Sequence, residues 1–181
     1  MSVRDPRGDA LQPDLLDVDD LAEAPAQPRT DLRATVLSSI SGASRLAGFS
    51  ERLAAFFDVA RERASELIEE AAGRAEGPSW EAIPVPGVRL FHLPGGPRVA
   101  AADCGLVRIE SGARFPAHRH VGDEWSFVLS GEAEEEGTGE RWAPGDLVHR
   151  PAGTAHAFRV TSREPLVFAV VLHGGLELAE E

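Results

Sequence analysis

The stretch GARFPAHRHVGDEWSFVLSG, residues 112–131, decides the fold class of this chain. It holds three candidate metal ligands, His118, His120 and Glu124, between two glycines. Because successive side chains of a strand point to opposite faces, the two histidines share a face if this stretch is extended, and Arg119 points away. Residues 121–123 predict a short turn, after which Glu124 begins the next strand. The pattern therefore indicates a chelating arrangement rather than scattered surface groups.

A second stretch, GDLVHRPAGTAH, residues 145–156, predicts the remaining ligand. Gly145 and Asp146 are typical of a tight turn, and residues 151–153 bend the chain back before a strand that carries His156. We expect His118, His120, Glu124 and His156 to converge from three neighbouring strands. Three imidazoles and one carboxylate suit Fe, Zn, Ni, Cu or Mn, and positions left open on the ion would take water, O2 or a substrate.

Strand signals dominate the chain after Trp80. Short runs rich in β-branched and aromatic residues alternate with Gly- and Pro-containing turns, and no helical pattern lies between them. Such spacing is typical of an antiparallel sandwich or barrel, so the chain is predicted to be mainly β.

Strand parity predicts what surrounds the candidate site. If Glu124 points inward, so do Ser126 and Val128, and the alternate positions point outward. The outward set is Trp125, Phe127 and Leu129. Because three large apolar side chains are a liability in water, the partner sheet, the N-terminal helices or a second subunit must cover them, and a homodimer is expected.

The N-terminal part is predicted to contain a tail and a helical region. Residues 1–30 carry seven acidic residues against three arginines, which predicts a disordered acidic tail or an arm that grips a basic partner. Residues 31–76 show helical spacing, with Ser50 and Asp58 as candidate N-caps and Gly73 as a helix end. Such short helices need a docking site, either on the rest of the chain or on another protein.

Composition excludes several classes of function. The net charge of -12 leaves no basic surface for direct nucleic-acid binding. No apolar run approaches the roughly 20 residues that cross a bilayer, and the first residues lack an apolar signal segment, so a cytoplasmic protein is expected. Cys104 is predicted to be a buried hydrophobe, and His149 and His173 to be surface or satisfied histidines. The remaining acidic run, Glu132 and Glu134 to Glu136, is predicted to be a solvated hairpin tip.

The two stretches together resemble the paired motifs of the cupin superfamily. The first motif is matched by Gly112, His118, His120, Glu124 and Gly131, and the second by Gly145, Pro151, Gly153 and His156, with Val160 in place of the family's Asn. The resemblance implies a jelly-roll barrel over residues 80–178 with a divalent metal near its centre.

Within that superfamily the chain resembles the ChrR-type anti-sigma factors. Trp80, the step from Pro86 to Val88, Arg108 and the motif PAHRHVGDE match. The resemblance implies an anti-sigma-like helical region at residues 31–76 that binds a sigma factor, and zinc in the barrel. The family's N-terminal zinc element is absent, since no histidine precedes His92 and no cysteine precedes Cys104.

Two functions therefore stay open. The first is a metal-binding anti-sigma factor or transcriptional regulator that senses a small ligand or an oxidant. The second is a metal-dependent cupin dioxygenase or a related small-molecule enzyme. Zinc is the preferred ion, with Fe, Mn, Ni or Cu as alternatives, and the sequence names neither the ligand nor the reaction.

Overall fold

The computed structural model describes residues 48–73 and 80–179. The helices in these ranges are α3 (Ser50–Phe57), α4 (Arg61–Ala71) and the 3-10 helix η2 (Pro97–Val99). The strands are β1 (Glu81–Ala82), β2 (Val88–Leu93), β3 (Asp103–Ile109), β4 (Arg114–His120), β5 (Glu124–Ser130), β6 (Ala133–Glu135), β7 (Arg141–Trp142), β8 (Leu147–Arg150), β9 (Ala155–Val160), β10 (Leu166–Leu172) and β11 (Leu176–Leu178).

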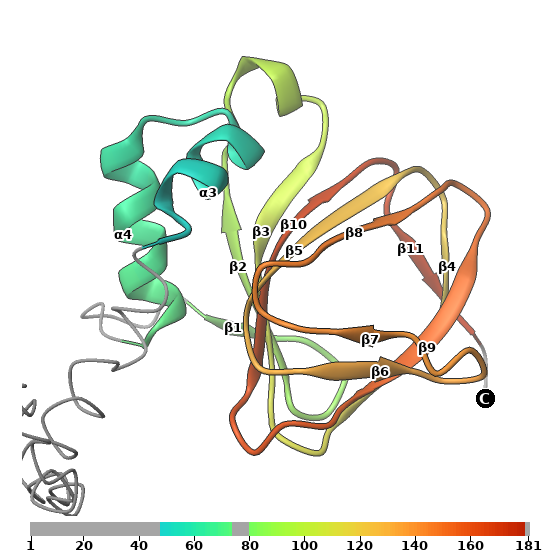
Figure 1. The fold of residues 1–181 in the computed structure, drawn as a ribbon. Helices are drawn as coiled ribbons and strands as arrows, with labels where there is room; N and C mark the ends of the chain where they lie inside the picture. The colour runs from blue at the N-terminus through green and yellow to red at the C-terminus, as the bar shows by residue number, and fades with distance from the viewer. Residues whose placement is uncertain (1–47, 74–79, 180–181) are drawn as a thin grey trace, which may run out of the picture. The chain divides into compact units, whose positions relative to one another are not determined.

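The described strands form two antiparallel sheets that face each other as a barrel (Figure 1). One sheet has the order β1-β2-β3-β10-β5-β8 and the other the order β11-β4-β9-β6-β7. This arrangement confirms the mainly β, jelly-roll class predicted from the sequence.

The barrel interior is an apolar core made by the inner faces of both sheets. Phe115 and Phe158 stack with ring centroids 5.4 Å apart, and Phe158 also meets Trp142 edge-on. Val128, whose inward position was predicted from parity, belongs to this interior cluster. The core therefore surrounds the place where the histidine-bearing strands β4 and β9 run side by side.

Helices α3 and α4 cover the outer face of the β5-containing sheet (Figure 1). Phe127 and Leu129, both predicted to point outward, are buried in one cluster with Leu53 and Phe57 of α3 and Leu67 of α4. The helices therefore cover two of the three side chains that the parity argument named, whereas Trp125 is 38% exposed. The homodimer stays a prediction.

The helix boundaries correct two predicted caps. Ser50 is the first residue of α3 rather than its N-cap, which is Phe49. Asp58 does not begin α4 but ends α3 in a left-handed conformation with φ 56°. Its carboxylate accepts hydrogen bonds from the backbone N and Nε of Arg98, at 2.9 and 2.8 Å. A cap that serves a partner 40 residues away cannot be recognised from local spacing.

The C-terminal end of α4 is as predicted. Gly73 follows the helix with φ 70°, a conformation that glycine adopts without strain, and its N–H reaches the carbonyl of Glu70. The acidic tail at 1–30 and the helical spacing before residue 48 lie outside the described residues. Among the described helices, none is both long and apolar enough to cross a membrane.

Candidate metal centre

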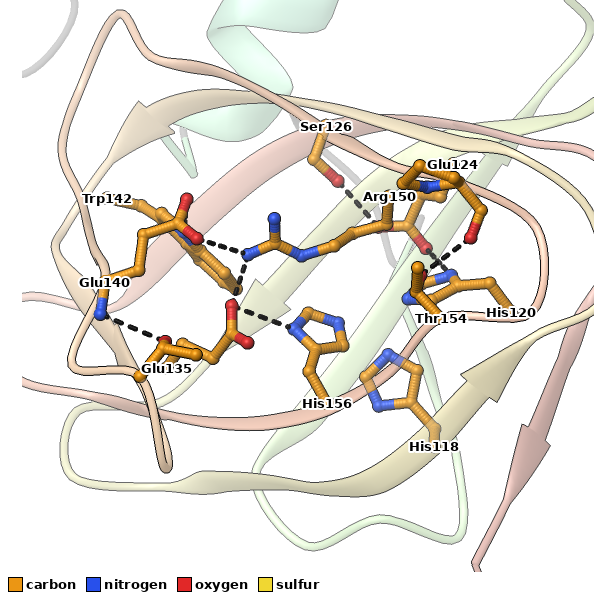
Figure 2. A network of polar contacts seen from close by, with 12 residues as sticks. His118, His120, Glu124, Ser126, Glu135, Glu140, Trp142, Arg150, Thr154 and His156 are labelled. Carbon is orange, nitrogen blue, oxygen red and sulfur yellow. Dashed lines mark hydrogen bonds and ion pairs between the residues drawn. The ribbon is translucent and has the colours of Figure 1, made fainter.

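Three histidines from two paired strands meet inside the barrel. His118 on β4 and His156 on β9 are direct register partners, and His120 lies two residues further along β4 on the same face. One ring nitrogen from each lies within 4.8 Å of the others, which is close enough for a shared ion. Figure 2 shows the three rings turned toward one another. The sequence prediction that these histidines converge is therefore realised.

Hydrogen bonding fits these rings to a cation. Nδ1 of His118 lies 2.9 Å from the carbonyl oxygen of Pro116. Because a carbonyl only accepts, Nδ1 carries the proton and Nε2 is left with its lone pair. Both ring nitrogens of His120 and of His156 are buried without a hydrogen bond. Buried polar atoms without partners are costly, and a metal ion bound by one nitrogen of each ring would remove that part of the cost.

The electrostatics of the site keep the rings neutral. Burial, together with the nearby His118 and Arg150, lowers the pKa of His156 to about 3 and that of His120 to about 4. Burial also lowers the pKa of His118. Neutral imidazole is the form that binds metal, so at neutral pH no proton has to leave these rings before an ion enters.

Glu124 approaches the group from the opposite sheet. It begins β5, so the candidate ligands come from two paired strands and one facing strand rather than from three neighbours. Its Oε2 lies 3.4 Å from Nδ1 of His120, and its Oε1 accepts a hydrogen bond from Ser126. Burial raises the pKa of Glu124. The carboxylate stands beside the histidines but outside the compact group of three.

Two charged residues that sequence reasoning missed lie at the same centre. Glu135 was predicted to be solvated, yet it is 9% exposed and its Oε2 lies 3.6 Å from Nδ1 of His156. The Arg150 guanidinium pairs with it (Figure 2). A strand as short as β6, three residues long, shows no clear alternation of polar and apolar residues. The inward position of Glu135 follows from the pairing of β6 with β9.

A cavity of about 190 Å³ is lined by one of the three histidines, His118, and by Glu124. Its walls are mostly apolar, including Leu90, Phe168 and Val170, and His118 and Glu124 contribute polar atoms. The volume is below the roughly 300–1,000 Å³ of sites for drug-sized molecules, so the space fits a small ligand.

The other residues that the sequence singled out lie in ordinary environments. Cys104 is buried, as predicted, and burial raises the pKa of its thiol. His149 stacks on Trp125 with centroids 4.0 Å apart, and its Nε2 is 3.7 Å from Asp123. His173 is exposed.

Comparison with known proteins agrees with this geometry. Residues 105–172 match the family profile of the cupin domain. The barrel is a cupin domain. The profile spans the first and second motifs, so the resemblance stated from their residues is confirmed.

Similar proteins differ in their functions. Dimethylsulfoniopropionate lyase DddQ of Ruegeria pomeroyi is 39% identical over 77 residues, which are 41% of this chain and 38% of DddQ. The match thus spans well under half of that relative. An RmlC-like cupin protein from Ralstonia eutropha superposes with a TM-score of 0.50 at 19% identity, covering 56% of this chain and 67% of that one. The anti-sigma ChrR of Rhodobacter sphaeroides, solved with SigE, gives a TM-score of 0.48 at 25% identity, covering 58% and 55%.

Proposed function

We propose that this cupin is a metal-dependent enzyme that converts a small, largely apolar molecule bearing an oxygen donor. The ion is held by His118, His120 and His156, with Glu124 as the fourth ligand. Zinc is the preferred ion, with Fe, Mn, Ni or Cu as alternatives, and with four protein ligands a substrate would bind at a fifth coordination position. The observation that carries the proposal is that His118 and Glu124 border the apolar cavity.

The residues that line the cavity have different expected roles in binding a substrate. Apolar walls such as Leu90 and Val170 bind the body of the substrate and exclude water. Glu124 and His118 lie where a polar end of the substrate would reach. A bound divalent ion would supply Lewis-acid polarisation of the substrate's oxygen. Ser126 donates to Glu124 at 2.8 Å and so fixes the orientation of that carboxylate.

An enzyme is favoured over a regulator by the packing of the helices. Leu53 and Phe57 of α3 and Leu67 of α4 are buried against the chain's own barrel, so these side chains are not available to a partner. The local similarity to a protein named as a lyase that acts on a small sulfonium compound supports the same reading.

The test begins with metal analysis of the purified full chain. We expect about one equivalent of a divalent ion, and we expect His156→Ala to lose most of it. The loaded protein is then offered a panel of small molecules, comprising dimethylsulfoniopropionate, 1,3-diketones and thiols. The variant Val170→Phe, which fills the cavity, should keep the metal and lose at least tenfold in turnover, whereas Leu147→Phe on the surface should not. Absence of metal from the wild type, or equal turnover by His156→Ala, would reject the proposal.

A second candidate function is that of a regulator. It is favoured because β5 carries a candidate metal ligand on one face and packs against the helices with the other. Its inward side carries Glu124 and Ser126, and its outward side carries Phe127 and Leu129 under the helices. A change at the metal is therefore next to the helical layer. In this case the full chain should retain an extracytoplasmic-function sigma factor in a pull-down, and ligand or oxidant at the metal should release it. Retention that does not respond to metal removal would count against a sensing role.

A further inference from the structure

Glu135 holds an unusual position for a carboxylate. It closes β6 and is 9% exposed, although glutamates are rarely buried without a partner. Figure 2 shows it between the Arg150 guanidinium on one side and the His156 ring on the other. It accepts a hydrogen bond from Nη2 of Arg150, and its Oε2 lies 3.6 Å from Nδ1 of His156. That distance is longer than an N–H···O bond of about 2.9 Å, so a small adjustment of the ring would complete the bond.

The environment of His118 shows what this contact does. Nδ1 of His118 is held by a backbone carbonyl at 2.9 Å, which leaves its Nε2 for the ion. In the described part of the chain no such hydrogen bond holds His156, whose two ring nitrogens are both buried without a hydrogen-bond partner. The carboxylate that faces Nδ1 of His156 belongs to Glu135, and its Oε2 lies 3.6 Å away. The Glu135 carboxylate thus lies on the Nδ1 side of His156 as the Pro116 carbonyl lies on the Nδ1 side of His118, but at 3.6 Å rather than 2.9 Å.

Glu135 is itself held in place. Arg150 bonds it and also bonds Glu140 at 3.1 Å, and the guanidinium lies over the ring of Trp142, 5.3 Å from its centroid. The backbone N–H of Glu135 donates to the carbonyl of Glu140 at 2.8 Å. Because the Arg150 guanidinium and the backbone hydrogen bond both restrain Glu135, its carboxylate can orient the neighbouring His156 ring.

We propose that Glu135 is a positioning residue of the metal centre, clamped by Arg150, that accepts the Nδ1–H of His156 and presents Nε2 of that ring to the ion. This inference rests on the proposed metal site. Glu135 lies outside the ligand set and outside both sequence motifs, and Arg150 lies within the second stretch but is not one of its motif positions.

The experiment is a Co²⁺ titration of the full chain, followed by visible absorption and by competition with a chelator. Glu135→Gln should weaken Co²⁺ binding by roughly 10- to 100-fold and change the absorption bands, since outer partners of ligating histidines affect affinity by that amount. The matched control is Glu140→Gln. It also removes a carboxylate from Arg150, but Glu135 rather than Glu140 is the carboxylate beside His156. This control should stay within about threefold of the wild type.

The outcomes separate the two proposals. A wild-type chain that does not bind Co²⁺ refutes the metal site itself. Normal wild-type binding with equal affinities for both variants refutes the role of Glu135 alone. Should Glu135→Gln fail to fold, the zinc-loaded wild type labelled with ¹⁵N-histidine decides the matter by NMR. A protonated Nδ1 and a metal-bound Nε2 on His156 support the inference, and the reverse tautomer overturns it.

Discussion

Phe127→Ala tests how firmly the helical pair is joined to the barrel. Phe127 is 1% exposed and its ring meets Phe49 at 5.3 Å and Phe56 at 6.1 Å, with the Arg52 guanidinium 4.4 Å away. Truncating a buried Phe costs about 3–5 kcal/mol, a range that includes the cavity left behind. Because aromatic and cation–π contacts are lost as well, we expect a loss of about 4 kcal/mol, above the lower end of this range.

The assay is urea unfolding and thermal unfolding, each followed by circular dichroism, with the metal removed from every sample. A loss of about 4 kcal/mol should lower the melting temperature by roughly 8–16 °C in a domain of this size. The matched control is Leu147→Ala, since Leu147 is the cross-strand partner of Phe127 but is 52% exposed, and it should change stability by no more than about 0.5 kcal/mol. A cost below about 1 kcal/mol for Phe127→Ala would show that the helices are not packed on β5 as described.

Three further predictions concern the site and its support. Zinc at 100 times its dissociation constant should stabilise the folded chain by about 2.7 kcal/mol, measured as a rise in melting temperature that His156→Ala abolishes. Because the pKa of His156 is about 3 and that of His120 about 4, below the roughly 6.5 of unfolded histidine, the unfolded state binds more protons between these values. The metal-free protein should therefore lose stability from pH 6.5 towards 4, and His156→Gln should make this loss smaller; an unchanged slope contradicts the assignment. Gly96→Ala would place a Cβ 1.8 Å from the Asp58 carbonyl oxygen, so it should lower the urea midpoint clearly while leaving Co²⁺ affinity unchanged.

The sequence predicted those features that depend on local spacing. The shared face of His118 and His120 follows from the period of a strand, and the outward position of Phe127 follows from the same parity. His156 was placed by turn residues that begin its strand. These inferences need only the local pattern, whereas the meeting of His156 with His118 depends on the pairing of β4 with β9 and was indicated by the two motifs taken together.

Features that depend on distant pairing were missed. Glu135 reads as one member of an acidic run, and only the pairing of β6 with β9 brings it beside His156. Asp58 resembles a helix start, but its partner Arg98 arrives from a separate segment. Both errors have the same cause: the partner of each carboxylate lies far away in the sequence, so local spacing does not reveal it.

The burial of Phe127 and Leu129 beneath the helices has a practical consequence for dissecting this protein. A fragment that starts at residue 80 would expose the apolar outer wall of β3, β5 and β10 to water and would be prone to aggregation. Loss of activity in such a truncation would report a damaged scaffold rather than a missing partner-binding module. The helices α3 and α4 should therefore be kept together with the barrel when the protein is produced, and the roles of the two parts are better separated by single-residue variants.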